Sequence, residues 1–62
     1  AIDSTIGDLM GQGSDLNNIG SALEQKGDLA EAKKSYQKAL SLFEKIDARN
    51  EIGFVRNSIE RL

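Results

Sequence analysis

Residues 16–44 read LNNIGSALEQKGDLAEAKKSYQKALSLFE, and this stretch decides the fold of the 62-residue chain. Its centre is Gly27-Asp28, where Gly suits the left-handed residue that ends one helix and Asp suits the N-cap of the next. Glu31 follows Asp28 by three residues, as in a capping box. The apolar residues that follow recur in steps of three and four, namely Leu29, Ala32, Tyr36, Ala39, Leu40, Phe43 and Ile46. This period predicts an amphipathic helix over Leu29 to Ile46.

A second helix is predicted before this turn. Leu16, Ile19 and Leu23 continue a helical period that ends at Lys26. Gly-Asp also occurs at residues 7–8, and further glycines follow at 11 and 13, so we expect a turn at 7–8 and a helix that begins near Leu9 or Asp15. A glycine in the middle of a helix costs about 1 kcal/mol against alanine. Because Gly20 lies on the apolar face, we expect a neighbouring helix to approach closely there.

A third helix is predicted at the end of the chain, with its apolar positions at Ile52, Val55, Ile59 and Leu62. The junction Asp47-Ala48 contains neither Gly nor Pro, so two alternatives stay open. Either the chain turns here and the third helix folds back, or the second and third helices run on as one long helix that exchanges partners between chains.

An internal repeat appears when the sequence is shifted by 40 residues, which aligns Gly13 with Gly53, Asn17 with Asn57 and Ile19 with Ile59. Periods of about 20–50 residues are typical of solenoid arrays. The sequence therefore predicts one all-α domain over residues 1–62. In it, residues 1–7 are the tail of one unit, residues 8–46 a complete unit, and residues 47–62 the first helix of the next.

The central stretch resembles the tetratricopeptide repeat family. Residues 16–23 fit the first-helix motif, with Leu16 and Leu23 at positions where the family often has Trp and Tyr. Ala32, Tyr36 and Ala39 fit the second-helix motif. Two features depart from the family pattern. The period is 40 residues rather than about 34, as in a longer-helix variant, and Glu44 stands where the family usually has Pro.

The resemblance implies an antiparallel helical hairpin plus a third helix, and a non-catalytic protein–protein interaction module that holds a peptide or protein segment on its concave face. The positions that face this groove in the family correspond to Asn17, Ser21, Glu24, Gln25, Phe54, Asn57 and Arg61. An Asn side chain offers both a donor and an acceptor, so it can pair with a peptide backbone. The family's carboxylate clamp needs Lys at position 17 and Asn at position 21, so we do not expect that clamp to bind a free peptide C-terminus here.

Self-association is the alternative function. A chain this short without cross-links is expected to be marginal alone, which suggests a piece of a larger protein, a self-associating chain, or both. One and a half units leave apolar end faces uncovered. We expect these faces, around Leu40, Phe43, Ile52 and Val55, to form homo-oligomers.

Composition excludes several other classes. The chain has no Cys and no His, so Ser-His or Cys-His nucleophile pairs and the favoured zinc ligands are missing. Gly7, Gly11 and Gly13 are not followed by the Lys-Ser or Lys-Thr of a phosphate loop. We therefore expect no enzyme activity and no cofactor or metal. No apolar run approaches a membrane span, and cytoplasmic location is the default expectation for a chain with no recognised export signal.

Nucleic-acid binding is also not expected, because the net charge is −2 and the signs are mixed. Four basic residues, Lys34, Lys38, Lys45 and Arg49, are predicted to fall on one helical stripe. No aromatic residue joins that stripe to stack on bases. A solvated face interleaved with Glu31 and Glu44 is the simpler interpretation of this stripe.

Overall fold

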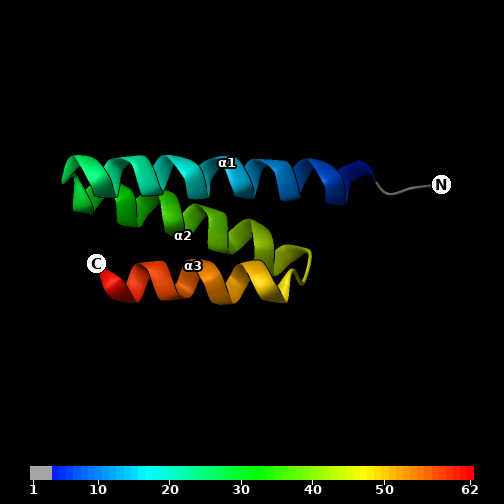
Figure 1. Ribbon diagram of the computed structural model, residues 1–62. Helices are drawn as coiled ribbons and strands as arrows, with labels where there is room; N and C mark the ends of the chain where they lie inside the picture. Colours follow the sequence, from blue (N-terminus) through cyan, green and yellow to red (C-terminus); the bar gives the residue numbers. More distant parts are fainter. Residues whose placement is uncertain (1–3) are drawn as a thin grey trace.

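A computed structural model describes residues 4–62, which form three helices in an up-down-up order (Figure 1). Helix α1 spans Ser4–Lys26, α2 spans Leu29–Lys45 and α3 spans Arg49–Arg61. The described residues contain no strand. The predicted all-α architecture, a helical hairpin followed by a third helix, is confirmed.

Helix α1 is longer than the sequence indicated. It begins at Ser4 and passes through Gly7 and Asp8 without a turn, so the turn predicted at residues 7–8 and the start near Leu9 or Asp15 are wrong. The reason is that a helical glycine costs only about 1 kcal/mol, and no Pro interrupts the backbone hydrogen bonds. Met10, inside this extension, also packs against the core. The predicted unit boundary at residue 8 therefore has no turn to mark it, and residues 1–3 of the predicted tail lie outside the described residues.

The two connections between helices have the same backbone motif. At the first, Gly27 has φ 92°, its N–H donates to the Glu24 carbonyl, and the Asp28 N–H donates to the Leu23 carbonyl. At the second, Asp47 has φ 55° and donates to the Glu44 carbonyl, and Ala48 donates to the Phe43 carbonyl. Both pairs of bonds follow the Schellman pattern that ends a helix at a left-handed residue. The left-handed Gly27 is confirmed.

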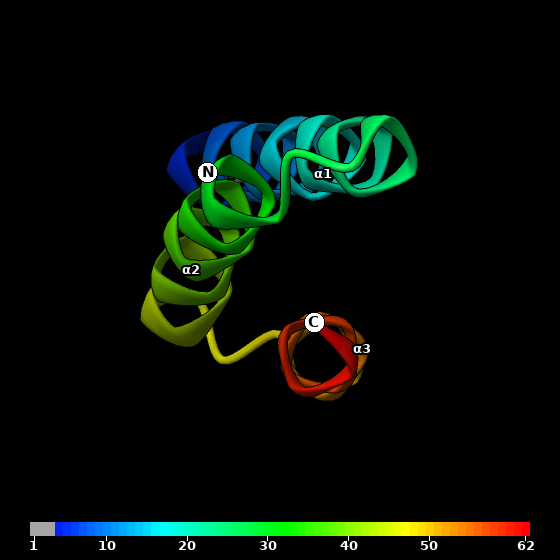
Figure 2. The ribbon, with the colours of Figure 1, turned by 90° about the vertical axis from the view of Figure 1, so that its left-hand side faces the viewer.

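Asp47 resolves the alternatives at the second junction. The chain turns there and α3 folds back along α2, so the continuous helix exchanged between chains is wrong for this structure (Figures 1 and 2). Asp is one of the few residues besides Gly that enters the left-handed region, because its short polar side chain can bond locally. Helix α2 consequently ends at Lys45, one residue before the predicted end.

Asp28 occupies the predicted N-cap position, but its side chain makes no capping hydrogen bond. Its ψ angle of 69° lies outside the extended conformation that normally points a cap side chain at the first helical N–H groups. The Schellman bond from the Asp28 N–H to the Leu23 carbonyl, at 2.9 Å, holds the backbone in this conformation.

Helices α1 and α2 approach closely where a glycine faces an aromatic ring. A Cβ atom on Gly20 would lie 2.8 Å from the Tyr36 ring, and one on Gly13 would lie 2.7 Å from the Phe43 ring. The two rings are seven residues apart in the sequence, and so are the two glycines. The two contacts therefore set one antiparallel register. The close approach predicted at Gly20 is confirmed, and Gly13 makes a second close approach of the same kind.

The core runs along α2, which packs against α1 on one side and α3 on the other (Figure 2). Its buried hydrophobic residues are Ala32, Tyr36, Ala39, Phe43, Ala48 and Val55. Phe43 and Val55 are only 2% and 1% exposed, so they are not the bare surfaces that were predicted for self-association. They are covered because α3 folds back and brings Val55 against the second helix of the same chain.

Candidate functional site

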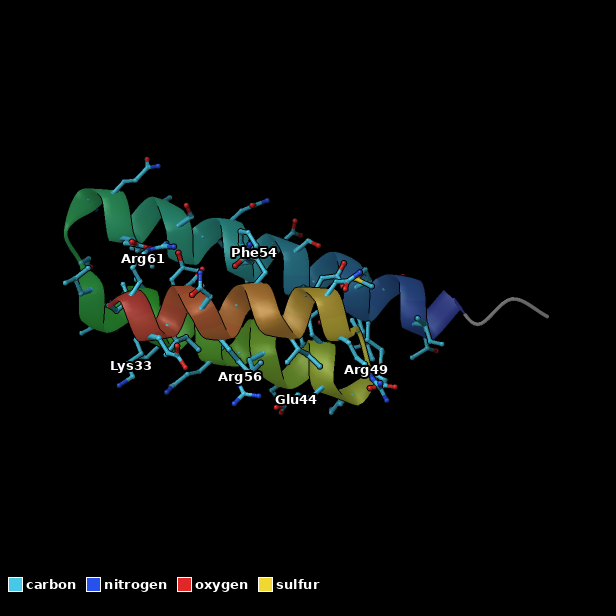
Figure 3. All side chains as sticks on the ribbon, turned by 60° about the horizontal axis from the view of Figure 1, so that its bottom comes forward. Lys33, Glu44, Arg49, Phe54, Arg56 and Arg61 are labelled. Atoms are coloured by element: carbon cyan, nitrogen blue, oxygen red, sulfur yellow. The ribbon has the colours of Figure 1, made fainter. Side chains whose placement is uncertain are left out.

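The candidate site is a small hollow between α1 and α3. It has a volume of about 150 Å³, and its floor includes the buried side chains of Phe43 and Val55. Its full lining is Ser14, Asn17, Asn18, Phe43, Glu51, Phe54 and Val55. Phe54 is 64% exposed and points from α3 toward α1 (Figure 3). An exposed aromatic ring beside an apolar floor is a typical anchor for a partner side chain.

Asn17 brings an unused polar atom to this hollow. Its Oδ1 atom is buried and, among the described residues, has no hydrogen-bond partner. An unpaired buried acceptor costs about 1–3 kcal/mol, so each such group in a native fold calls for an explanation. Because the atom is covered in the free chain, a donor from outside, such as a backbone N–H, would satisfy it only after the Asn17 side chain turns into the hollow.

Glu24 and Arg61 were predicted to face a ligand, but they face each other. Arg61 donates from Nε at 3.3 Å to Oε2 of Glu24, and from Nη2 at 3.0 Å to Oε1. The Tyr36 hydroxyl donates to Glu24 Oε1 at 2.8 Å. This charged cluster of Tyr36, Glu24 and Arg61 therefore joins α2, α1 and α3. The Glu24 carboxylate and the Arg61 guanidinium already make hydrogen bonds inside the fold, which leaves fewer for a ligand.

The cluster shifts the titration of its members. The hydrogen bonds from Arg61 and then from Tyr36 hold the pKa of Glu24 below its ordinary value of 4.5. Burial of the ring, followed by the hydrogen bond to Glu24, raises the pKa of Tyr36 above 10.0. The lowered pKa of Glu24 and the raised pKa of Tyr36 both favour an ionised Glu24 beside a neutral Tyr36 at neutral pH.

The remaining predicted groove residues are only partly brought together. Ser21 and Gln25 are exposed on α1. Asn57 does not join Asn17, because it lines a different hollow with Arg49, Ile52, Gly53, Arg56 and Glu60. The two Asn side chains therefore do not meet in one hollow, since the residues that line the hollow at Asn57 all belong to α3.

Three residues of the hollow were missed from the sequence, namely Ser14, Asn18 and Glu51. A signal for two of them was available. Ser14 precedes Asn17 by three residues and Glu51 precedes Phe54 by three residues, so each lies one helical turn from a residue that was identified.

The predicted basic stripe is also divided by the fold. Arg49 lies in α3 beyond the turn and contacts Asp47, with 3.3 Å between Nε and Oδ1. Lys34 contacts Glu31 at 3.3 Å on the exposed surface of α2. The four basic residues therefore do not share one helical face.

Two properties of the described residues bear on other classes of site. None of the helices within residues 4–62 is apolar over enough of its length to cross a membrane. No group of three or more acidic side chains in this part of the chain is placed to hold a metal ion.

Comparison with known proteins identifies the family. Residues 16–46 match the family model described as Tetratricopeptide repeat. The chain belongs to the tetratricopeptide repeat family, and it is a member of a group of helical repeats that are generally non-catalytic protein-interaction modules. No curated protein and no solved structure gives a significant match to this chain.

Proposed function

We propose that the hollow between α1 and α3 binds a segment of a partner protein through one apolar side chain and one backbone N–H group. The apolar side chain would lie against Phe54, above the floor formed by Phe43 and Val55. The N–H group would donate to Asn17 Oδ1 once the Asn17 side chain turns into the hollow. The observation that carries this proposal is the buried, unpaired Oδ1 atom beside an exposed aromatic ring.

The charge at the edge of the hollow favours a basic residue next to the apolar one. Glu51 lines the hollow, is half-buried, and its carboxylate makes no ion pair with any described residue. A carboxylate in this position attracts a Lys or Arg side chain and repels an acidic one. The proposed ligand is therefore an apolar-basic peptide segment.

Selection from a phage-displayed library of random peptides tests this proposal. We expect the wild-type chain to enrich peptides in which an apolar residue lies beside a basic one. Phe54→Ala removes the aromatic wall, and Asn17→Ala removes the acceptor. Each substitution should lower the affinity for the enriched peptides by about tenfold or more, because one lost anchor or hydrogen bond of this kind is worth about 1–2 kcal/mol.

The matched control is Asn57→Ala, which removes the same type of side chain from a position in α3 that does not line this hollow. This variant should keep wild-type affinity, measured by isothermal titration calorimetry with the enriched peptides. Equal binding by Asn17→Ala and the wild type, or a larger loss in Asn57→Ala, contradicts the proposed site. Circular dichroism of each variant separates a lost contact from a lost fold.

Self-association is a second candidate function, and one observation favours it. After Phe43 and Val55 are assigned to the core, Leu40 and Ile52 remain only half-buried and each borders a hollow on the α2–α3 side. Partly exposed apolar residues at a hollow are a common feature of protein interfaces.

A further inference from the structure

Two surfaces outside the hollow between α1 and α3 combine half-buried apolar residues with exposed charges. The first, named the α3 face, consists of Ile52 and Ile59 with Arg49 and Arg56. The two isoleucines are half-buried and the two arginines are exposed. Arg56 points away from α1, opposite to Phe54 (Figure 3). Two hollows lie along this face, one bordered by Ile52 and the other by Ile59, and Arg56 borders both.

The second surface, named the α1 face, consists of Leu9 and Leu16 with Asp8 and Asp15. The two leucines are half-buried and the two aspartates are exposed. Ile19, which is 50% exposed, extends the apolar part of this surface. Each face thus combines two half-buried apolar residues with two charges, and the sign of these charges is opposite on the two faces. Glu60 adds one acidic side chain at the border of both hollows on the α3 face.

The spacing of the two faces also matches. In every pair the two residues are seven positions apart: Asp8 with Asp15, Leu9 with Leu16, Arg49 with Arg56, and Ile52 with Ile59. Seven helical residues rise about 10.5 Å and return to nearly the same side of the helix. The two carboxylates and the two guanidinium groups therefore present charges at the same interval.

Direction follows from the order of the residues. Each Asp precedes its Leu by one residue, a rotation of about 100° around the helix, whereas each Arg precedes its Ile by three, about 60° in the opposite sense. Two helices that pack through these apolar residues and run in the same direction face each other. In that case a charge rotated one way from the apolar residues on one helix lies on the same side of the contact as a charge rotated the other way on its partner. A parallel pairing would therefore place Asp8 near Arg49 and Asp15 near Arg56.

Three of the four charges on these two faces are unpaired within the described fold, and the fourth is in an exposed ion pair. Within residues 4–62, the carboxylates of Asp8 and Asp15 and the guanidinium of Arg56 make no ion pair. The Arg49 contact with Asp47 is fully on the surface, with side chains 84% and 74% exposed, and pairs of this kind contribute little.

We propose that the α3 face of one copy of this chain binds the α1 face of a second copy, with the two helices parallel. The proposal rests on self-association, the second candidate function, and names the surfaces that form it. Because the two faces differ, the contact is heterologous. An open assembly of any length keeps an unused α1 face at one end and an unused α3 face at the other. Association therefore extends to trimers and longer species rather than stopping at a dimer.

Analytical ultracentrifugation of charge-reversed chains tests this proposal, over chain concentrations from about 10 μM to 1 mM at low and high salt. The first variant is Asp8→Lys with Asp15→Lys, and the second is Arg49→Glu with Arg56→Glu. Each variant alone places like charges across the contact, so its dissociation constant should rise at least tenfold. An equal mixture of the two variants restores opposite charges at every contact and should associate as the wild type does.

The matched control is Lys38→Glu with Lys45→Glu, which makes the same change in net charge as the second variant at two exposed residues that are also seven positions apart. This control should keep wild-type association. A wild type that stays monomeric throughout contradicts both self-association and the proposed contact. If the wild type associates but the two variants do as well, or if their mixture does not recover, self-association stands and the proposed pairing of faces is wrong.

Discussion

At the residue scale, the contact between α1 and α2 depends on the absence of two side chains. Gly20 lies against the Tyr36 ring, and Gly13 lies against the Phe43 ring. Both rings are buried, with 1% and 2% of their surface exposed. A ring held on all sides cannot move away from an added methyl group at little cost. The glycines are therefore determinants of the distance between the helices, although each one lowers the intrinsic stability of α1.

This leads to a prediction for Gly20→Ala. The new Cβ atom would lie 2.8 Å from the Tyr36 ring, which is closer than non-bonded carbon atoms approach. We expect the free energy of unfolding, measured by urea denaturation, to fall by about 1–2 kcal/mol, because overpacking outweighs the gain in helix propensity.

Gly11→Ala is the matched control for this substitution. Gly11 lies in the same helix and nothing lies within 4 Å of the added Cβ atom, so the same change should raise stability by up to about 1 kcal/mol. Stabilisation by both substitutions would show that the Tyr36 ring does not limit the approach of the two helices.

At the element scale, the two turns show that one backbone motif can be encoded by different residues. Gly27 is the expected residue for a left-handed helix end, and its turn was predicted correctly. Asp47 performs the same backbone task with φ 55°, but the sequence alone left a continuous helix as an alternative. The next residue, Ala48, is 9% exposed and belongs to the core, so packing after the turn supports a conformation that local preference leaves open.

The turns allow a prediction at this scale. Gly27→Ala places a Cβ atom on a residue with φ 92° and should lower the free energy of unfolding by about 1–2 kcal/mol. Asp47→Gly removes the Cβ penalty at the corresponding position and should leave stability unchanged or raise it by up to about 1 kcal/mol. Thermal unfolding followed by circular dichroism measures both. A loss of stability in Asp47→Gly as large as that in Gly27→Ala would show that the Asp side chain, rather than the left-handed backbone, supports the second turn.

At the scale of the whole molecule, the charged cluster of Tyr36, Glu24 and Arg61 is the polar contact that spans all three helices. Direct packing links α1 to α2 and α2 to α3, whereas the ion pair between Glu24 and Arg61 connects the first helix to the last. Protonation of Glu24 should therefore loosen the arrangement of α3 relative to α1, which is also the arrangement that forms the candidate hollow.

The cluster predicts an acid dependence of stability. Because the pKa of Glu24 is lowered in the folded state, its contribution is fully present above the ordinary value of 4.5 and is lost as the pH falls through the lower folded-state pKa. We expect Glu24→Gln to be less stable than the wild type at pH 7, and the difference to shrink as the pH falls below 4.5. Urea denaturation at a series of pH values measures this.

Glu44→Gln serves as the control for the acid dependence, because the Glu44 side chain is exposed and makes no hydrogen bond or ion pair with a described residue. It should show no such pH-dependent difference from the wild type. A difference between Glu24→Gln and the wild type that stays constant from pH 7 to pH 3 would mean that ionisation of Glu24 does not stabilise the fold.

The sequence by itself determined the parts of this protein that depend on period and local backbone preference. The apolar steps of three and four located α2 and the apolar faces of α1 and α3, Gly27 marked the first turn, and residues 16–46 carry the family. Only the tertiary structure decided which surface covers which. It placed Phe43 and Val55 in the core, paired Glu24 with Arg61, and separated Asn57 from Asn17. The physical reason is that a helical period defines a face of one helix, whereas burial and pairing depend on the angle at which the next helix returns, and packing along the whole chain sets that angle.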